Sequence, residues 1–258
     1  MSTLPQPGQW YQVCADLDLY DRPLSGDPDP DRLATQGWAG RFLQITGPIE
    51  ADCWPVQLLE DGYGAWLRSG DLAQLEPVAT VPDLPPPIAP EAIPPCLAAA
   101  IAWVEAAAAV PNQYRWGGTV APDYDCSGLM QAAFAQTGLW LPRDAYQQEA
   151  FLQPLPWDHP HDRSAPPLWH LWQPGDLVFF GPPAKATHVG LYLGEGRYLH
   201  SSGRAIGRNG IGLDRLDPKA GPVSRAYFEQ LRGAGRIVQS YTPELRSLKV
   251  YVRSVRSD

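Results

Sequence analysis

The amino-acid sequence predicts a two-domain protein, a small β-barrel followed by a larger α+β domain. Eight prolines fall within residues 77–95, a density that interrupts helices and inner strands and therefore indicates an extended linker. Short β-favouring runs dominate residues 1–76. In residues 96–258 helical patterns come first and strand patterns follow, which is typical of α+β folds in which helices pack on an antiparallel sheet.

The composition is that of a folded protein, because 44% of the 258 residues are hydrophobic and 19% are charged. A formal net charge of -8 disfavours a nucleic-acid partner. The apolar run Leu97–Val110 is shorter than the roughly 20 residues that span a bilayer, so we expect no membrane partner. The first residues do not have the pattern of a secretory signal, which predicts a cytoplasmic location with reduced cysteines.

Four strands are predicted in the first domain, because β-favouring residues cluster there between turn signals. Asp61-Gly62 is typical of a tight hairpin turn between the last two. The expected strands are Tyr11–Cys14, Phe42–Ile45, Cys53–Leu58 and Ala65–Leu67.

Two helices are predicted at the start of the second domain. An alanine-rich helix over Cys96–Val110 ends at Pro111. A second helix covers Ser127–Thr137, where apolar residues recur at helical spacing before Gly138. Four strands are expected after them, at Leu177–Phe180, His188–Leu193, Arg197–Ser201 and Arg236–Gln239.

Cys126 stands just before the predicted start of the second helix. Unpaired backbone N–H groups and the positive end of the helix dipole favour a thiolate at such a position, and the same groups can hold an oxyanion. The position predicts a cysteine nucleophile. From this segment alone, a buried cysteine without reactivity is an equally good interpretation.

Two histidines are expected to share one face of neighbouring strands. With Leu193 opposite Arg197 across a short glycine-containing loop, His188 and His200 occupy diagonal positions about 7 to 8 Å apart. One imidazole could then orient the other as a base for the thiol of Cys126. For either histidine alone, a satisfied core or surface residue is the simpler interpretation.

Two sets of motifs resemble known families. Segments of the first domain resemble bacterial SH3-like domains, namely Ala15–Tyr20, Trp54–Val56 and Gly64–Leu67. Between Pro111 and Tyr241, six motifs in order resemble those of NlpC-type cysteine peptidases, which have a papain-like core and cleave peptidoglycan peptides. These motifs are Tyr114–Gly118, Asp125–Gly128, Leu141–Arg143, Gly175–Phe180, Thr187–Tyr192 and Tyr198–Ser201. Together the two domains resemble the cyanobacterial γ-D-glutamyl-L-diamino acid endopeptidases.

The resemblance implies the catalytic residues. Cys126 would be the nucleophile, His188 the general base, and His200 the residue that orients it. Tyr114 would stand beside the thiol and, with the backbone N–H of Cys126, steady the tetrahedral oxyanion.

The resemblance also implies the substrate-binding residues. Asp125 and Ser127 would hold the ammonium group of an N-terminal L-Ala, for which a carboxylate is a suitable partner. Tyr63 would close the same subsite from the SH3-like domain, or it is an ordinary hairpin tyrosine. Some relatives carry a serine where this chain has Ala145, which puts one substrate hydrogen bond in doubt.

Residues 157–172 form a long connection rich in Pro, His and Trp. Its prolines and irregular spacing disfavour a preorganised metal site, so we expect a solvated loop over the cleft. The candidate ligands there are Asp158, His159, His161, Asp162 and His170. No metal or organic cofactor is implied by the resemblance.

The sequence therefore predicts a cytoplasmic cysteine endopeptidase that recycles cell-wall peptides. The bond cut in the resembling enzymes joins γ-D-Glu to the diamino acid of a murein peptide that begins with free L-Ala, and this peptide is the expected partner. Two alternatives stay open. One is a thiol amidase or acyltransferase on the same scaffold. The other is a catalytically silent peptide-binding module, which the presence of both Cys126 and His188 disfavours.

Overall fold

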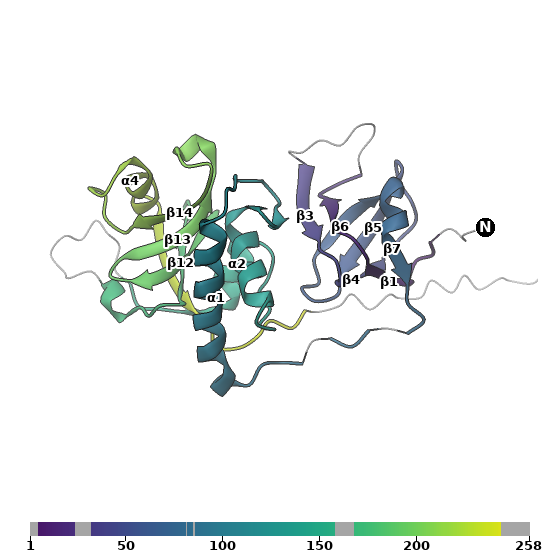
Figure 1. Cartoon of the computed structure of the whole chain (residues 1–258), viewed down its shortest axis with the longest axis horizontal. Helices are drawn as coiled ribbons and strands as arrows, with labels where there is room; N and C mark the ends of the chain where they lie inside the picture. Colours follow the sequence, from purple (N-terminus) through teal and green to yellow (C-terminus); the bar gives the residue numbers. More distant parts are fainter. Residues whose placement is uncertain (1–4, 24–31, 81, 85, 158–167, 244–258) are drawn as a thin grey trace, which may run out of the picture.

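The computed structural model describes residues 5–23, 32–80, 82–84, 86–157 and 168–243. It contains a strand-rich body from the first part of the chain and a body of helices and sheet from the rest (Figure 1). The segment that joins them runs below the strand-rich body, in the view of Figure 1, and enters helix α1 (Ile93–Ala108) at its lower end.

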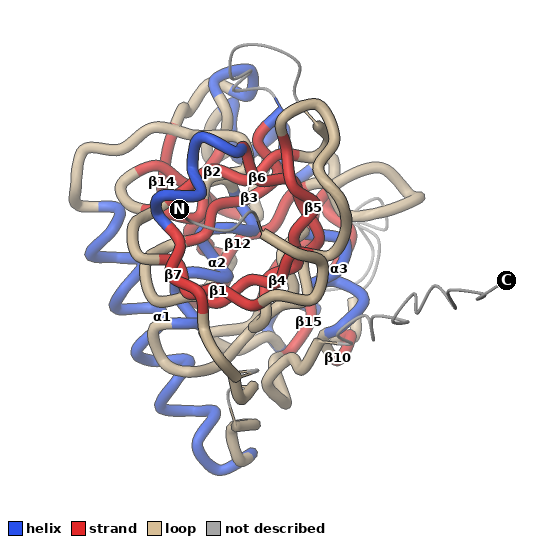
Figure 2. Tube along the Cα trace, turned by 90° about the vertical axis from the view of Figure 1, so that its right-hand side faces the viewer, coloured by secondary structure: helices blue, strands red, loops and turns tan. Residues whose placement is uncertain are grey.

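Seven short antiparallel strands of the first body surround an apolar core, and they form a ring when viewed from that end of the molecule (Figure 2). Their order in the sheet is β3-β2-β6-β5-β4-β1-β7. Alternate side chains point inward, so that Val13, Leu19, Leu43, Ile45 and Leu67 are at most 1% exposed. The strands are β1 (Trp10–Val13), β2 (Leu17–Tyr20), β3 (Leu33–Gly37), β4 (Phe42–Ile45), β5 (Cys53–Leu58), β6 (Gly64–Arg68) and β7 (Leu75–Pro77).

This architecture confirms the expected SH3-like barrel, with three strands more than the sequence predicted. Strands β4 and β5 have the predicted bounds, whereas β2, β3 and β7 were missed. Strand β7 lies at the edge of the sheet, where Pro77 pairs with Tyr11. Proline is tolerated at an edge because its missing N–H removes no inner ladder bond. The proline-rich segment therefore begins with the end of a strand.

In the second body, α2 (Cys126–Ala135) lies between α1 and a six-stranded antiparallel sheet. The strand order is β10-β15-β11-β12-β13-β14, and α2 packs on β12 and β13. This arrangement confirms the predicted α+β class. The remaining elements are β8 (Thr119–Val120), β9 (Asp123–Tyr124), α3 (Ala145–Phe151), β10 (Gln153–Pro154), β11 (Leu177–Phe180), β12 (His188–Gly194), β13 (Arg197–Ser202), β14 (Gly210–Arg215), α4 (Pro222–Phe228) and β15 (Leu231–Arg236).

The last strand is the largest error of the sequence prediction. Strand β15 ends at Arg236, where the predicted strand was expected to begin. The interruption of β15 by two glycines hid its strand pattern. A Cβ atom on Gly233 would lie 3.0 Å from the Trp157 ring, and one on Gly235 would lie 2.7 Å from Leu152 Cβ. These glycines make room for side chains that cover the sheet.

A tight turn sets the register between β12 and β13. Its two residues, Glu195 and Gly196, both have positive φ, 53° and 70°, as in the two-residue turns that favour hairpins. The predicted pairing of Leu193 with Arg197 is therefore wrong, and Gly194 is the partner of Arg197. A β-bulge between Tyr192 and Gly194 shifts the pairing by one residue, so that Leu191 pairs with Leu199 in the predicted register.

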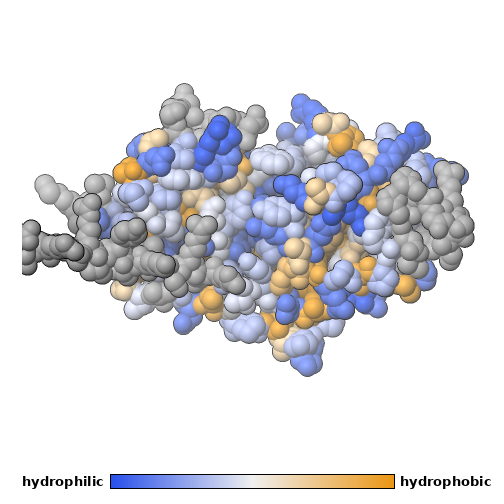
Figure 3. Space-filling model, turned by 180° about the vertical axis from the view of Figure 1, so that it is seen from behind, coloured by the Kyte–Doolittle hydropathy of each residue, from blue (hydrophilic) through white to orange (hydrophobic). Residues whose placement is uncertain are grey.

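Helix α1 begins inside the segment that was predicted as linker, three residues before the expected start at Cys96. Two prolines occupy its first turn, where their missing N–H groups cost no helical bond. The stretch Pro90–Ala108 has the length and apolar composition of a membrane-spanning helix, with a mean hydropathy of 1.3. Only 17% of this stretch is buried, although α1 buries Ala100 and Val104 and packs against α2. Apolar surface gathers on the lower part of this body (Figure 3).

Buried polar contacts and stacked rings join the two bodies. The Nε of Arg143 donates to Oγ1 of Thr35 at 2.9 Å, and the arginine side chain is 1% exposed. The rings of Trp38 and Trp140 stack with their centroids 5.7 Å apart, and the guanidinium of Arg41 lies over both. Unpairing such groups would leave buried donors unsatisfied, so the contacts favour one relative placement of the bodies.

Candidate active site

Cys126 is the first residue of α2, which Asp125 caps by accepting a hydrogen bond from the Gly128 N–H at 2.6 Å. The cysteine is buried, and the N–H groups of Val189 and Ser127 hydrogen-bond its sulfur. Burial, together with Asp125, raises the pKa of Cys126 to about 12 despite these donors. The helix N-terminus therefore does not make a thiolate unaided, and the thiol needs a base.

The structure brings the two predicted histidines into contact. Nε2 of His188 lies 2.6 Å from Nδ1 of His200. The residue that follows His188 bonds the Cys126 sulfur, so the start of β12 lies beside the thiol. The ring of Tyr227, from α4, stacks on His188 with a centroid distance of 4.2 Å. The start of β12, with the contact between His188 and His200, therefore lies beside the Cys126 thiol.

Burial decides the charge of these histidines. It lowers the pKa of His188 well below its ordinary value, and the neighbouring His200 adds to the effect. Burial also lowers the pKa of His200, against the opposing influence of Asp214. Both rings are therefore neutral near pH 7, and a neutral imidazole is able to accept a proton from a thiol.

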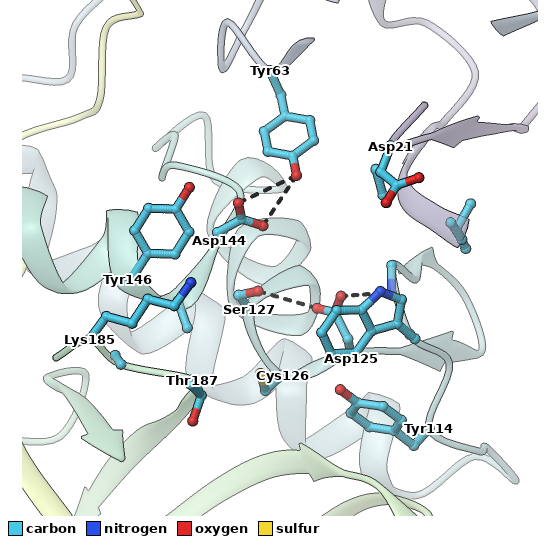
Figure 4. Close-up of a pocket in the computed structure, with 16 residues that line it drawn as sticks. Asp21, Tyr63, Tyr114, Asp125, Cys126, Ser127, Asp144, Tyr146, Lys185 and Thr187 are labelled. Carbon is cyan, nitrogen blue, oxygen red and sulfur yellow. Dashed lines mark hydrogen bonds between the residues drawn. The ribbon is translucent and has the colours of Figure 1, made fainter. Parts of the chain in front are cut away.

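A cavity of about 300 Å³ opens beside Cys126, with walls from both bodies (Figure 4). Leu33 and Tyr63 line it from the SH3-like barrel, and Tyr114 lines it from the second body. Burial, followed by the nearby Cys126, raises the pKa of Tyr114 above its ordinary value, so its hydroxyl keeps its proton and serves as a donor. Tyr63 and Tyr114 thus line one cavity together with Cys126.

Asp125 and Ser127 are already engaged within the protein. Nη2 of Arg143 lies 2.7 Å from Oδ2 of Asp125, and its Nη1 donates to Oγ of Ser127 at 3.1 Å. The N–H of Gly117 also donates to Asp125, at 3.0 Å. Both residues line the cavity, but both oxygens of the Asp125 carboxylate already accept hydrogen bonds within the protein. Their implied role in binding an ammonium group stays a prediction.

Asp144 is a second carboxylate at the cavity, directly after Arg143 in the sequence. The hydroxyl of Tyr63 donates to it at 3.3 Å (Figure 4). Burial raises the pKa of Asp144 above its ordinary value, against the lowering effect of Arg143. None of the ion pairs among the described residues includes Asp144. The carboxylate also accepts from the Tyr146 hydroxyl and caps α3. Its hydrogen-bond partners are thus uncharged, which leaves its charge for a cationic group of a ligand.

Lys185 brings a positive charge to the same cavity. Its ammonium group lies 5.0 Å from the centroid of the Tyr146 ring, which also lines the cavity. A cation over an aromatic face is held by the ring quadrupole and stays accessible to an anion. The cavity thus offers both a carboxylate and an ammonium group.

Sequence reasoning missed several residues of this site, although one signal was present. Arg143 belongs to the Leu-Pro-Arg motif that carried the resemblance, but no role was assigned to it. Asp144 and Lys185 flank recognised motifs without belonging to them. Asp214, which contacts His200, lies on β14, a strand that was not predicted.

The histidine-rich stretch that was weighed as a metal site lies mostly outside the described residues. This applies to Asp158, His159, His161 and Asp162, whereas His170 lies in a short 3-10 helix, Leu168–Leu171. Within the described part of the chain, no group of three or more His, Cys, Asp or Glu side chains could hold a metal ion.

Comparison with known proteins identifies both bodies. Residues 111–212 match the NlpC/P60 family, and residues 24–72 match the bacterial dipeptidyl-peptidase SH3 domain. The bifunctional muramidase/DL-endopeptidase CwlT of Bacillus subtilis is 36% identical over 112 residues, which are 42% of this chain and 28% of that protein. The probable endopeptidase p60 of Listeria seeligeri is 32% identical over 124 residues, or 48% of this chain and 19% of that protein.

The chain thus spans less than a third of the length of these two relatives. Among solved structures, an NlpC/P60 family protein from Bacillus cereus ATCC 10987 is 21% identical, with a TM-score of 0.43 over 90% of this chain and 64% of that one. The two sequence matches fall in the two bodies of the fold, in the same order. The chain therefore carries an NlpC/P60 domain behind a bacterial SH3 domain.

Proposed function

We propose that the protein is a cysteine endopeptidase that hydrolyses the bond between γ-D-Glu and the diamino acid of murein peptides with a free N-terminal L-Ala. The observation that carries this proposal is the joint cavity. The thiol of Cys126 and the carboxylate of Asp144 line one cavity, which Tyr63 borders from the SH3 domain. Such a cavity suits a short peptide with a cationic end near the bond that is cut.

Catalysis would follow the acyl-enzyme route. The thiol proton of Cys126 passes to His188 as the sulfur attacks the γ-carbonyl carbon of D-Glu. The oxyanion of the tetrahedral intermediate accepts hydrogen bonds from the Cys126 N–H and the Tyr114 hydroxyl. The amine of the diamino acid leaves with the proton from His188, and a water molecule then hydrolyses the thioester with His188 as base.

Recognition of the free N-terminus would depend on Asp144. A carboxylate whose side-chain partners are the neutral hydroxyls of Tyr63 and Tyr146 can accept an ammonium group without breaking an existing ion pair. The Tyr63 hydroxyl stays protonated, because burial and Asp144 raise its pKa above the ordinary value. Its ring and hydroxyl would border the end of this subsite. An acylated or glycan-linked L-Ala would lack the ammonium charge that pairs with Asp144, and its added group would clash with Tyr63.

Lys185 would recognise the α-carboxylate of D-Glu. In a γ-linked peptide this carboxylate is free, whereas in an α-linked peptide it is consumed in the amide bond. The ammonium of Lys185, held at the cavity by Tyr146, would therefore favour γ-linked over α-linked glutamyl peptides.

The direct test is incubation with L-Ala-γ-D-Glu-meso-diaminopimelate and detection of the dipeptide L-Ala-D-Glu by mass spectrometry. We expect cleavage of the free tripeptide and much slower cleavage of its N-acetylated form. Equal rates on both would contradict the proposed specificity. Absence of hydrolysis, combined with binding of the tripeptide, would favour the silent peptide-binding alternative.

A role in recycling within the cytoplasm is part of this proposal. The substrate with a free L-Ala is the form that arises after murein peptides are released from glycan. Fractionation of the native organism, with detection of the full-length chain, would test the location.

A further inference from the structure

The histidine pair contacts a third buried polar group, the carboxylate of Asp214. Oδ2 of Asp214 lies 2.9 Å from Nε2 of His200, and Asp214 is 7% exposed. Oγ of Ser224 donates to the other carboxylate oxygen at 2.8 Å. Burial opposes the charge of Asp214, but the hydrogen bonds from His200 and Ser224, with the charge of Arg208, leave its pKa below the ordinary value. Asp214 is therefore ionised.

An ionised Asp214 fixes every proton of the histidine pair. A carboxylate only accepts, so Nε2 of His200 carries the proton. Because His200 is neutral, its Nδ1 has a lone pair and accepts from Nε2–H of His188. The remaining nitrogen of His188, Nδ1, then has the lone pair that takes the thiol proton of Cys126. The opposite tautomer of either ring would leave two lone pairs or two protons facing each other.

Arg208 makes this arrangement compatible with a neutral His200. An aspartate alone beside a histidine favours the doubly protonated ring, and a protonated Nδ1 could not accept from His188. Arg208 contacts the same oxygen of Asp214 through Nε at 3.0 Å and Nη2 at 2.5 Å. Its charge opposes protonation of His200.

Gly212 gives Arg208 access to Asp214. It lies opposite His200 in the β13–β14 ladder. A Cβ atom there would be 2.0 Å from Nη1 of Arg208, a distance that no real contact allows. The absence of a side chain lets the guanidinium lie over the strand.

Other titratable groups around the rings are uncharged. They are Cys126 from α2, Tyr198 from β13 and Tyr227 from α4, and burial raises the pKa of each of them. Among the described residues that face the two histidines, Asp214 and Arg208 are thus the charged ones.

We propose that Asp214 and Arg208 are positioning residues that lock the tautomers of the catalytic histidine pair, Asp214 by accepting the His200 proton and Arg208 by keeping His200 neutral. The effect of this lock on catalysis rests on the function proposed above. The tautomers themselves do not, because they exist in the protein without substrate.

The test uses the full-length protein with two readouts. Histidine ¹⁵N spectra without substrate report tautomer and ring charge, and kinetics on the tripeptide report kcat and KM against pH. In the parent, we expect both rings as Nε2–H tautomers. The variants are Arg208→Gln, the conservative Arg208→Lys and the surface control Arg204→Gln, whose arginine is exposed in the preceding turn.

Arg208→Gln should let His200 take a second proton. We expect the His200 pKa and the acid limb of kcat to move to higher pH by about one unit, with KM little changed. Arg208→Lys should restore most of the parent behaviour, and Arg204→Gln should match the parent. Asp214→Asn removes the negative charge, so it should lower kcat about tenfold or more and move the histidine titrations in the opposite direction.

A merely structural role would not give shifts of opposite sign. The proposal is overturned if the ¹⁵N titration gives the same His200 pKa for Arg208→Gln as for the control Arg204→Gln. It is also overturned if the rings of the parent are not Nε2–H tautomers. If the parent fails to cleave the tripeptide, the proposed function fails, and the spectra still decide whether the lock exists. If Asp214→Asn does not fold, the partly exposed Arg208 still provides the decisive variants.

Discussion

The hydroxyl oxygen of Tyr63 in the SH3 domain lies 3.3 Å from a carboxylate oxygen of Asp144 in the NlpC/P60 domain. This contact crosses the domain boundary at the rim of the cavity that contains Cys126. The end of the cavity that is proposed to bind substrate is thus shared between the domains, and its two residues can be tested separately.

Asp144→Asn should impair recognition of a free N-terminus, because the amide has no charge for the ammonium group. We expect kcat/KM for the free tripeptide to fall about 30- to 100-fold, equivalent to about 2–3 kcal/mol for a hydrogen bond to a charged group. The N-acetylated peptide should be cleaved at its parent rate. Tyr63→Phe, which keeps the ring, is the matched control and should show a smaller loss. Equal losses on both peptides would show that Asp144 does not bind the amine.

Asp125→Asn should act mainly on stability. It leaves the buried guanidinium of Arg143 without its charged partner, and breaking a buried pair costs about 3–5 kcal/mol. Urea denaturation followed by tryptophan fluorescence measures this change. Asp144→Asn, at the cavity and outside the ion pairs of the described residues, is expected to change the free energy of unfolding by less than about 1 kcal/mol. If Asp125→Asn is as stable as the parent but loses discrimination for the free amine, Asp125 holds the substrate ammonium after all.

Cys126→Ala should abolish hydrolysis and leave the fold intact, since alanine keeps the start of α2. His188→Ala should be nearly as damaging, because the thiol with its raised pKa needs a base. Activity losses from removing a nucleophile and its base are strongly non-additive, so the double variant Cys126→Ala/His188→Ala should be little less active than Cys126→Ala alone. Initial rates with the tripeptide, alongside circular dichroism of each variant, measure this. Turnover near the parent rate in Cys126→Ala would refute the nucleophile.

Lys185→Gln should weaken binding of the D-Glu α-carboxylate. We expect KM for the tripeptide to rise about 5- to 10-fold, the loss of about 1 kcal/mol or more from one exposed charge-assisted contact. A peptide with D-isoglutamine, whose α-carboxylate is an amide, should be affected little. Lys219→Gln, at an exposed position beyond β14, is the charge-matched control. A parallel change for both peptides would remove Lys185 from the specificity assignment.

The protein should lose stability as the pH falls below about 6.5. His188 and His200 have lowered pKa values in the folded chain. Between those values and the ordinary pKa of about 6.5, the unfolded chain binds protons that the folded chain does not, so unfolding is favoured by up to about 1.4 kcal/mol per histidine and pH unit. The raised pKa of Asp144 has the opposite sign and acts at lower pH.

Urea titrations between pH 7 and pH 5 measure this dependence. His188→Gln should reduce the slope by about half, because one of the two buried rings is gone. A free energy of unfolding that stays constant over this interval would contradict neutral burial of the pair.

The sequence predicted the parts of the site that depend on local pattern. Cys126 at a helix start and the register of His188 and His200 follow from periodicity and turn signals, and a bulge preserved the register although the closing pair of the hairpin was wrong. Asp214 could not be found in this way. Strand β14 has glycines where apolar residues would indicate a strand. One of them, Gly212, has no side chain because the guanidinium of Arg208 occupies that space.

Contacts between residues far apart in the sequence were also beyond the sequence. The ammonium-binding role was assigned to Asp125 by resemblance, and the structure shows that Arg143 reaches Asp125 from another loop and engages it. No spacing in the chain reveals that pairing. Tyr63 was placed at the site by resemblance alone, and its partner Asp144 emerged only from the three-dimensional arrangement.

The hydrogen bond between Thr35 and Arg143 has a consequence for synthesis of the protein. Translation produces the SH3 domain first, and domains generally fold as units in the order of their synthesis. The segment with Cys126 and Arg143 then emerges beside a barrel that already presents Thr35. We expect a truncated nascent chain to be without a complete site, so that the proposed peptidase activity begins only when both domains have been made and docked.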